Sequence, residues 1–455
     1  MKKVQSVLDL IGNTPILKLQ HLDTGCCELF VKLENQNPGG SIKDRIALSM
    51  INAAEEEGRL KPGGTIIEAT SGNTGISLAL VAAFKGYKLI IVMPDKMSTE
   101  KISHLRAMGA EVRMTRSDVA KGHPEYYQDI AERLSKEIPN CFYIDQFNNP
   151  ANPVAHEKTT APEIWEQMEH RVDAVVAGVG SGGTITCMSR FFAKVSPKTK
   201  IILADPAGSI LTDYIHSKKI GTAGSWFVEG IGEDFVPAIA DLSRVGPAYY
   251  VSDAESFSTA RELLQKEGIF GGSSTGTLVA AALRYCRESK IPQRVVTFIP
   301  DSGNKYLSKM YNDYWMADHG FIKRESRGDL RDFVARPHTN GATTFIRPDD
   351  TLMTAFFRMR LNDYSQLPVI ENGRVVGIID EYDLLVAVEN DSAKYRASAK
   401  EYMAHDLKIL QPNAPRAELT EILRSGKVGV LYSDTTFYGL ITKTDVLYHL
   451  RRNMP

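Results

Sequence analysis

Short, continuously apolar runs alternate with helical patterns from about residue 10 to residue 310. The runs have the length of β-strands and lie at residues 65–69, 88–93, 173–179, 200–204 and 294–299. After the first run, Ile76, Leu80 and Phe84 recur at helical spacing, which predicts a helix with these residues on one side. Continuous apolar strands separated by helices are typical of parallel sheets that are covered on both faces. The pattern therefore predicts an α/β fold.

The charge balance and the cysteines exclude several classes of function. The 455 residues carry a formal net charge of -1, so the chain lacks the excess of basic residues that binds nucleic acid or an anionic membrane. No apolar run approaches the roughly 18 residues of a membrane span, and Gln5, Ser6 and Asp9 interrupt any secretory signal core. The five cysteines lack C-x-x-C spacing, which indicates a reducing compartment and no metal site. We expect a soluble, cytoplasmic protein.

A charged stretch with few apolar residues separates the region of alternating strands and helices from a region with an internal repeat. We interpret residues 317–335 as a linker between an α/β core, residues 1–316, and a C-terminal module, residues 336–455. The module contains an internal repeat with copies at about residues 336–390 and 396–453. In this repeat Gly377 matches Gly439, and an apolar strand precedes each. The two copies are expected to bury their sheets against each other.

A loop of the sequence Pro-Gly-Gly-Ser precedes Lys43. Ser41 can cap the helix that follows, and this puts Lys43 in the first helical turn. The helix dipole and desolvation both lower the pKa of a lysine at that place, and a neutral amine is what Schiff-base chemistry requires. A solvated surface lysine paired with Asp44 or Glu34 explains the same segment, and taken alone the segment favours that interpretation.

Three further loops open helices. Residues 70–74 offer hydroxyl and backbone N–H groups that suit a carboxylate, although an ordinary turn has the same residues. The glycines of residues 180–184 let the backbone approach a phosphate at a helix N-terminus. This loop misses the G-x-G-x-x-G spacing of dinucleotide sites, and the chain lacks a P-loop lysine. Residues 271–276 are by themselves only a turn.

In this order, the four segments resemble the fold-type II pyridoxal phosphate (PLP) enzymes of the cysteine synthase and cystathionine β-synthase group. Residues 11–15, 32–34 and 143–153 also match. The resemblance covers residues 4–316 and implies two α/β subdomains with parallel sheets. The C-terminal repeat resembles a pair of CBS motifs, which is called a Bateman module.

The resemblance implies a role for each matching residue. Lys43 matches the lysine that carries PLP as a Schiff base, Asn73 the partner of its 3′-oxygen, and Ser274 the hydroxyl partner of its pyridine nitrogen. The residues that match the phosphate loop are Gly180, Ser181, Gly182, Gly183 and Thr184. The residues that match contacts to the substrate carboxylate are Thr70, Ser71, Thr74 and Gln146.

These roles imply β-replacement, with PLP as the electron sink. A neutral Ser274 does not hold the pyridine nitrogen protonated, so the sink is mild, which suffices for β-elimination and should suppress transamination. Lys43, released when the substrate amine forms the external aldimine, can take the α-proton and return it. Loss of the β-substituent gives an aminoacrylate, to which a thiol adds.

Two branches of the group use different substrates, and the chain could belong to either. One condenses L-serine with L-homocysteine to L-cystathionine and water, and the other makes cysteine from O-acetylserine and sulfide. Residues 228–235, residues 300–309 and the C-terminal repeat favour the first branch, with hydrogen sulfide production as a side activity. A catalytically silent, nucleotide-sensing homologue is a third hypothesis, against which Lys43, Asn73 and Ser274 argue.

The sequence departs from animal relatives of the first branch at two positions. Glu233 and Phe147 stand where those relatives have tyrosine. Near the second substrate, the Glu233 carboxylate would pair with the homocysteine ammonium. The segment at residues 11–15 begins too early to leave room for the haem-binding extension of the animal enzymes, so we expect no haem.

In Bateman modules, a T/S-x-x-D element after the last strand often binds the ribose of an adenosine ligand. Thr442 and Asp445 fit this element, whereas the first copy has Asp380 in place of the hydroxyl residue. Two interpretations stay open. The module binds one adenosyl ligand, S-adenosylmethionine or else AMP or ATP, or it only packs subunits together or holds a lid. We also expect a homodimer or a larger assembly.

Overall fold

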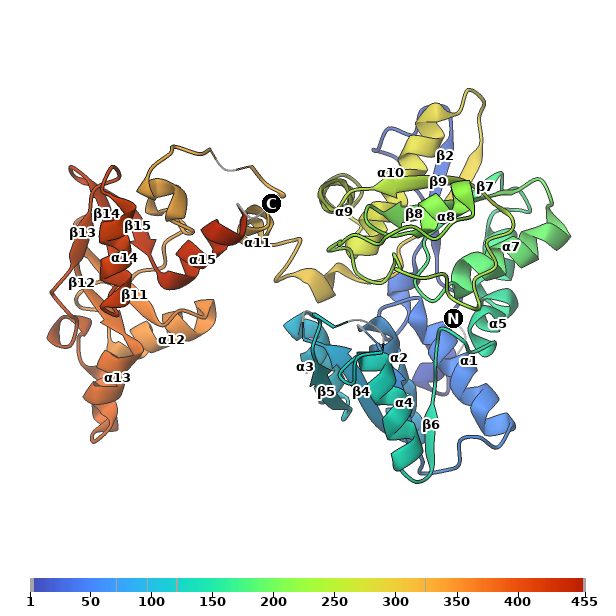
Figure 1. Ribbon diagram of the computed structural model, residues 1–455, viewed down its shortest axis with the longest axis horizontal. Coiled ribbons are helices and arrows are strands. Elements are labelled where there is room, and N and C mark those ends of the chain that lie inside the picture. The colour runs from blue at the N-terminus through green and yellow to red at the C-terminus, as the bar shows by residue number, and fades with distance from the viewer. Residues whose placement is uncertain (1–3, 71, 96, 120–121, 324, 453–455) are drawn as a thin grey trace. The chain divides into compact units, whose positions relative to one another are not determined.

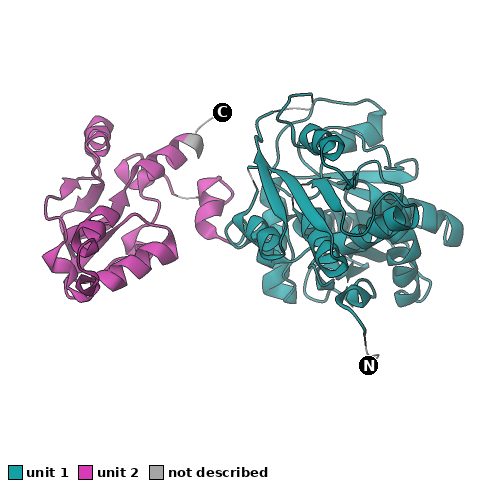
Figure 2. Ribbon diagram, turned by 90° about the horizontal axis from the view of Figure 1, so that it is seen from below, with its two compact units in different colours: residues 1–311 teal, residues 312–455 magenta. Residues whose placement is uncertain are grey.

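The computed structural model describes residues 4–452, apart from residues 71, 96, 120–121 and 324. The chain divides into two compact units, residues 1–311 and residues 312–455 (Figure 1, Figure 2). The division falls before the predicted boundary at residues 316 and 317. Within the described residues, no helix is both long and apolar enough to cross a membrane.

The larger sheet of the first unit has six strands. In their order across the sheet these are β1 (Ile16–Lys18), β2 (Glu28–Lys32), β10 (Arg294–Phe298), β7 (Ala174–Ala177), β8 (Lys200–Pro206) and β9 (Val245–Val251). β1 pairs antiparallel with β2, and every other neighbouring pair is parallel. Leu29, Val175 and Ile202 of this sheet are fully buried in one core cluster with side chains of the surrounding helices.

The smaller sheet of the first unit has four parallel strands. In order these are β5 (Glu111–Thr115), β4 (Lys88–Pro94), β3 (Thr65–Ala69) and β6 (Cys141–Tyr143). Ile66 and Ile91 pack into one core cluster, whereas their neighbours Ile67 and Val92 pack into another. Alternate residues of a strand point to opposite faces, so both faces of this sheet are covered. The five strands predicted from the apolar runs are β3, β4, β7, β8 and β10, and the predicted α/β fold is confirmed.

Ten α-helices surround the two sheets. They are α1 (Lys43–Glu56), α2 (Asn73–Lys85), α3 (Thr99–Ala107), α4 (Tyr127–Glu137), α5 (Ala151–Lys158), α6 (Thr160–Gln167), α7 (Gly183–Val195), α8 (Leu211–Ser217), α9 (Asp253–Glu267) and α10 (Ser273–Glu288), counted over the residues that the structure describes. The predicted apolar side of α2 is wrong in part, because Phe84 is 54% exposed while Leu78 and Val81 are fully buried. α2 contacts α1, α3 and β4, so it is enclosed on more sides than one apolar stripe requires.

The second unit holds the repeat. Its strands are β11 (Gln366–Glu371), β12 (Arg374–Asp380), β13 (Lys408–Leu410), β14 (Gly429–Ser433) and β15 (Thr436–Ile441). Its helices are α11 (Asp313–Asp318), α12 (Leu352–Asn362), α13 (Glu381–Val388), α14 (Arg416–Arg424) and α15 (Lys443–Arg452). Buried Ile370 and Val375 from one copy pack with Val430 and Phe437 from the other. The two copies therefore bury their sheets against each other, as predicted.

Each copy of the repeat is completed by the segment that leads into the strands of the other copy. A Cβ on Gly377 of β12 would lie 2.5 Å from the sulfur of Met403, which leads into β13 of the second copy. A Cβ on Gly439 of β15 would lie 2.5 Å from Cγ1 of Val334, which precedes the first copy. The matched glycines thus make room for the crossing segments, and this exchange ties the two copies into one body.

The exchange corrects the predicted linker at residues 317–335. Leu330, Phe333 and Val334 are buried, and they pack in the core of the second copy with Leu431 and Ile441. The abundant charges around these residues are those of a solvated surface, and they conceal the few apolar side chains that anchor the segment. The last part of the predicted linker therefore belongs to the folded module.

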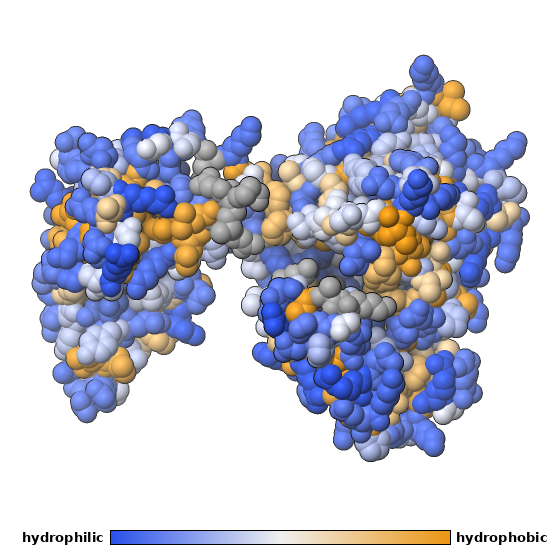
Figure 3. Space-filling model, viewed as in Figure 1, coloured by the Kyte–Doolittle hydropathy of each residue, from blue (hydrophilic) through white to orange (hydrophobic). Residues whose placement is uncertain are grey.

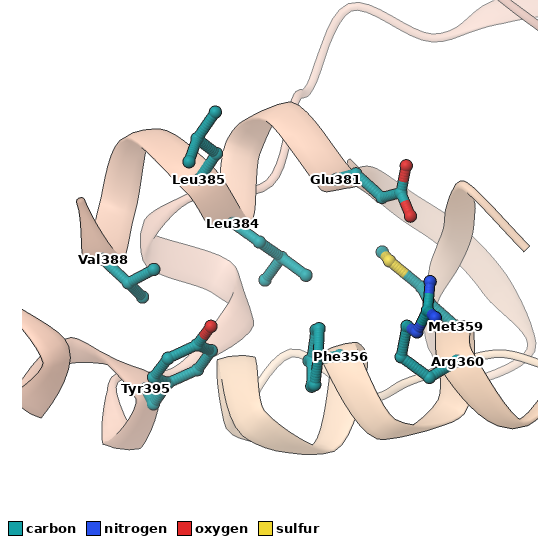
Figure 4. Close-up of a pocket in the computed structure, with 8 residues that line it drawn as sticks. All are labelled: Phe356, Met359, Arg360, Glu381, Leu384, Leu385, Val388 and Tyr395. Carbon is teal, nitrogen blue, oxygen red and sulfur yellow. The ribbon is translucent and has the colours of Figure 1, made fainter.

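Figure 3 shows that the visible face of each unit is mainly hydrophilic, with separate apolar areas. A cavity of about 390 Å³ lies between α12 and α13 in the second unit (Figure 4). Its lining is apolar, for example Phe356, Leu384 and Tyr395, apart from the charged Arg360 and Glu381. The predicted PLP-binding residues all lie elsewhere, in the first unit.

Candidate active site

The four loops that open α1, α2, α7 and α10 are linked to one another. Ser41 pairs with Asp301, and Gly271 pairs with Ser302, in isolated backbone bridges. The Asn73 amide at the start of α2 donates a 2.8 Å hydrogen bond to the Asp301 carboxylate. The α7 loop joins them through residues 229–230, because Gly180 packs on the Gly230 carbonyl and the Glu229 N–H donates to Ser273. The structure therefore gathers the four predicted segments at one site.

Lys43 is the first residue of α1, as predicted, and it is half-buried. The two partners of a surface lysine are engaged elsewhere. Asp44 accepts hydrogen bonds from the Gly39 N–H and the Ser77 hydroxyl, both at 2.5 Å, and Glu34 accepts from Arg45 at 2.7 Å. The Ser41 hydroxyl accepts the Lys43 N–H at 3.3 Å, although the residue at the N-cap position is Ile42.

Burial lowers the pKa of the Lys43 amine to about 8, and the negative charges of Glu233 and Asp301 oppose the shift. Near neutral pH the amine is therefore partly in its neutral form. A neutral amine at a helix start, with no ion-pair partner among the described residues, is able to attack an aldehyde.

The predicted phosphate loop is closely packed against neighbouring segments. A Cβ on Gly180 would lie 2.5 Å from the Gly230 carbonyl oxygen, and one on Gly183 would lie 1.9 Å from Oδ1 of Asn152. Asn152 Nδ2 donates to the Ser181 hydroxyl at 2.9 Å. The first N–H groups of α7 have no partner within the helix. A glycine cradle with these donors at a helix start fits a phosphate group.

Ser274 lies in the first turn of α10 and is 4% exposed. Its hydroxyl makes no hydrogen bond to any residue that the structure describes. The neighbouring Thr275 hydroxyl is also buried without a partner. Buried hydroxyl groups rarely remain unpaired, so this helix start suits a polar ligand atom.

The residues predicted to hold the substrate carboxylate form a chain of hydrogen bonds. The Thr74 hydroxyl donates to Gln146 Oε1 at 2.8 Å, and Gln146 Nε2 donates to Glu68 Oε1 at 3.0 Å. The Thr70 hydroxyl accepts the Gly72 N–H at 3.3 Å. Ser71 lies outside the described residues. The structure brings Thr74 and Gln146 together, next to a buried carboxyl group that the sequence reasoning missed.

Glu68 is 1% exposed, and burial raises the pKa of its carboxyl to about 8. The nearby charge of Asp145 acts in the same direction, while the hydrogen bond from Gln146 opposes the shift. Near neutral pH its protonated form is therefore favoured. A neutral Glu68 can orient the Gln146 amide without repelling an anionic substrate.

Glu233 is half-buried and close enough to Lys43 for their charges to interact. Burial raises the pKa of the Glu233 carboxyl well above its usual range, the Asp234 charge acts in the same direction, and the Lys43 charge opposes the shift. The backbone of Glu233 is fixed by Ser209, whose hydroxyl accepts its N–H at 3.1 Å. The expected pairing of a Glu233 carboxylate with an ammonium therefore competes with a preference for the protonated form.

A second group of buried charges near the site was missed. Glu229 accepts hydrogen bonds from Lys101 at 2.5 Å and from Lys309 at 2.6 Å. Lys101 is 2% exposed and lies over the Tyr306 ring at 4.7 Å from its centroid. Glu229 and Lys309 lie in stretches that carried only a family resemblance in the sequence, and Lys101 carried no signal at all.

No group of three or more His, Cys, Asp or Glu side chains is placed to hold a metal ion in the described part of the chain. The donors of the site suit an organic ligand with a phosphate. The Gly180–Gly183 cradle, the Asn73 amide, the Ser274 hydroxyl and the Lys43 amine would supply one contact for each polar group of PLP.

Comparisons with known proteins agree with this fit. The sequence pattern of the family described as pyridoxal-phosphate dependent enzyme matches residues 7–301, and that of the CBS domain matches residues 337–390. The cystathionine beta-synthase of Apis mellifera is 36% identical to the chain over 464 residues, which cover 99% of this chain and 92% of that protein.

Two solved structures resemble part of the chain. A hydrogen sulfide-producing enzyme from Fusobacterium nucleatum is 40% identical, with a TM-score of 0.63, over 67% of this chain and 100% of that chain. An O-acetylserine dependent cystathionine beta-synthase from Helicobacter pylori is 36% identical, with a TM-score of 0.62, over 68% of this chain and 99% of that chain. The chain is an enzyme that uses PLP, and its reaction is of the β-replacement kind. It belongs to the pyridoxal-phosphate dependent enzymes and, within them, to the cystathionine beta-synthase family.

Proposed function

We propose that the enzyme condenses L-serine with L-homocysteine to L-cystathionine and water. The observation that carries the proposal is Glu233, a buried carboxyl group that favours its protonated form and whose charge interacts with that of Lys43. Hydroxide is a poor leaving group and needs a proton as its bond to Cβ breaks, whereas acetate leaves without one. A protonated Glu233 therefore suits serine better than O-acetylserine.

The proposed contacts to the cofactor rest on the family resemblance, and the gathering of the four loops at one site supports them. Residues 180–184 would hold the phosphate, Asn73 the 3′-oxygen and Ser274 the pyridine nitrogen, with Lys43 as the covalent anchor. When bound, PLP supplies the electron sink that makes the α-proton of the substrate acidic. The Lys43 amine takes that proton and later returns it to Cα.

The substrate carboxylate would be held by Thr70, Ser71, Thr74 and Gln146. One hydrogen of Gln146 Nε2 is donated to Glu68, which leaves the second for the carboxylate. The Thr74 hydroxyl donates to Gln146 Oε1, so both side chains have a defined orientation before substrate arrives. Glu68 is a positioning residue in this arrangement.

Glu233 both supplies and recovers the proton that the replacement of hydroxide by the thiol requires. Glu233 donates its proton to the serine hydroxyl oxygen, which departs as water when the Cβ–O bond breaks. The thiol of homocysteine then forms the Cβ–S bond and gives its proton to the Glu233 carboxylate. Glu233 is thus ready for the next turnover.

We expect Glu233→Gln to reduce the rate with serine plus homocysteine by roughly 100-fold or more, because glutamine has no acidic proton to give to hydroxide. The rate with O-acetylserine plus the same thiol should change by less than about threefold, since acetate needs no proton. The measurement is the steady-state rate of both reactions in the native enzyme and the variant. Glu111→Gln, the same substitution at an exposed position of β5, is the matched control.

Two outcomes contradict this assignment. An equal loss with both β-substituents would mean that Glu233 does not act on the leaving group. Activity of the native enzyme with O-acetylserine but not with serine would also contradict it, and the Helicobacter pylori relative is an O-acetylserine dependent enzyme. Hydrogen sulfide release from cysteine plus homocysteine is a proposed side activity, and sulfide trapping measures it in the same preparations.

For the second unit we propose one adenosyl ligand at Thr442 and Asp445. The match to the CBS domain supports the proposal. Asp445 Oδ2 accepts the Thr442 N–H at 2.7 Å and its hydroxyl at 2.6 Å, which forms a cap at the start of α15. Asp383 makes the equivalent contact in the first copy, where it accepts the Asp380 N–H at 3.0 Å. Asp383 is therefore a matched control for the capping role.

Calorimetric titration of the whole enzyme with S-adenosylmethionine, AMP and ATP is expected to give binding heat with one of them. Asp445→Asn should weaken that binding by about tenfold or more, because it removes a charged acceptor for ribose hydroxyls. Asp383→Asn should leave it unchanged, although both variants lose a cap contact worth about 1 kcal/mol. Absence of heat with all three ligands would leave the module a structural role.

A further inference from the structure

Lys305 places an ammonium group within the active site, and no step proposed above uses it. The residue lies in a short 3-10 helix, Gly303–Tyr306, and is 6% exposed. Its Nζ donates to Asn73 Oδ1 at 2.9 Å and to the carbonyl oxygens of Gly39 and Gly40, each at 3.2 Å. Lys305 therefore connects the start of α2 to the loop that leads into Lys43.

We propose that Lys305 is a positioning residue for the cofactor, which orients the Asn73 amide toward the PLP 3′-oxygen and braces the loop that carries Lys43. The inference rests on the proposed contact between Asn73 and the 3′-oxygen. It is independent of which amino acid and thiol are the substrates.

Lys305 fixes the orientation of the Asn73 side chain. An ammonium only donates hydrogen bonds, so the side of the Asn73 amide that faces Lys305 has to be its oxygen. On the other side, Asn73 Nδ2 donates to Asp301 Oδ2 at 2.8 Å, and the Tyr306 hydroxyl donates to the same oxygen at 2.7 Å. If the amide were flipped, Asn73 would lose its hydrogen bonds with both Lys305 and Asp301. Lys305 and Asp301 together therefore fix the amide and leave the second Nδ2 hydrogen for an acceptor such as the 3′-oxygen.

Lys305 also holds the loop before Lys43. Gly40 has a φ of 72°, and its carbonyl accepts the Ser302 N–H at 3.2 Å in addition to Lys305. The Ile42 N–H donates to the Pro300 carbonyl at 2.8 Å. The side chain of Lys305 thus adds to a backbone attachment that ends one residue before Lys43, which limits where the amine can lie.

Lys305 brings a positive charge to the site. Burial lowers the pKa of its ammonium to about 8, while Asp301 and Asp44 favour the charged form and Lys101 opposes it. A cation beside Asn73 also stabilises negative charge on the 3′-oxygen. Loss of the cation should therefore change the visible absorption of the bound cofactor, and a purely structural lysine would not have this effect.

The test is the affinity and absorption spectrum of PLP in Lys305→Met, measured by equilibrium dialysis and spectrophotometry of the holoenzyme. We expect PLP binding to weaken by roughly tenfold, together with a shift in the visible absorption maximum. Lys305→Arg should retain most of the affinity because it keeps a cationic donor. Lys32→Met is the control, since Lys32 is a fully buried lysine that binds Glu163, Gln167 and the Thr14 carbonyl.

A double-mutant cycle decides whether Lys305 acts through Asn73. In an Asn73→Ala background, Lys305→Met should weaken PLP binding by clearly less than it does alone. Equal losses in both backgrounds, or an effect no larger than that of Lys32→Met, would overturn the inference while leaving the Asn73 contact intact. An Asn73→Ala variant with native affinity and spectrum would overturn the contact and the inference together. If Lys305→Met does not fold, Lys305→Gln replaces it, and native affinity and spectrum in that variant overturn the inference.

Discussion

Lys43→Ala is expected to lower turnover by at least roughly a thousandfold. The substitution removes the covalent anchor of the cofactor and the base that carries the α-proton, and each role by itself contributes orders of magnitude. Borohydride reduction of the native holoenzyme followed by peptide mapping should label Lys43, and reduction of the variant should label no lysine. Added methylamine should restore part of the turnover, because a free amine can replace the missing base.

Lys305 is the other lysine most able to carry the cofactor and so to be labelled by borohydride reduction. It also lies next to Asn73, and burial lowers its pKa to about 8 as well. The two lysines differ in their partners. The Lys305 ammonium is bound by three oxygen atoms, whereas the structure shows no hydrogen bond from Lys43 Nζ to a described residue. A label on Lys305, or on any lysine other than Lys43, would contradict the assignment of the anchor.

The sequence was sufficient for the parts of the fold that depend on local pattern. Fully buried parallel strands need continuous apolar runs, so β3, β4, β7, β8 and β10 were visible as such runs. Helix starts carry small polar residues and glycines, so the loops before α2, α7 and α10 were visible too. The position of Lys43 at the start of α1 followed from the same kind of signal.

The parts that failed depend on tertiary contacts. Glu68, Lys101 and Lys305 are single polar residues without a periodic signal, and their partners lie up to 266 residues away in sequence. Only the folded chain shows that they are buried and bonded. The prediction of a linker failed because a few apolar residues, such as Phe333, are buried in spite of their charged neighbours.

Arg45→Met is expected to destabilise the first unit by about 3–5 kcal/mol, because it leaves buried carboxylates without their main partner. Arg45 is 3% exposed and donates to both oxygens of Glu34 and to both oxygens of Glu163, at 2.7 to 2.8 Å. The measurement is urea unfolding, followed by the absorption of the bound cofactor. Lys136→Met, which breaks an exposed 2.7 Å pair with Glu132, is the control and should change the stability by less than about 1 kcal/mol.

The same pairs predict a dependence on pH. Hydrogen bonds and charges from Arg45 and Lys32 lower the pKa of Glu163 to about 2, against the opposing effect of burial. A carboxyl whose folded pKa is lowered stabilises the fold above its unfolded pKa, and this stabilisation is lost as the pH falls. The native enzyme should therefore lose stability from about pH 5 downward toward pH 2. Arg45→Met should lose less over this range, because part of the pKa shift is already gone.

The double variant Arg45→Met with Glu34→Gln tests whether Arg45→Met loses stability through an uncompensated buried charge or through lost packing and hydrogen bonds. If the penalty comes from an uncompensated buried charge, removing the Glu34 charge as well should restore part of the stability lost in Arg45→Met. Glu34 is fully buried and keeps the Thr14 hydroxyl and Asn37 as partners, so a neutral amide can be accommodated there. A double variant that is less stable than Arg45→Met would mean that packing and hydrogen bonds hold this side of α1 against residues 12–14. In that case Lys43 would depend for its position on the shape of the cluster rather than on its charges.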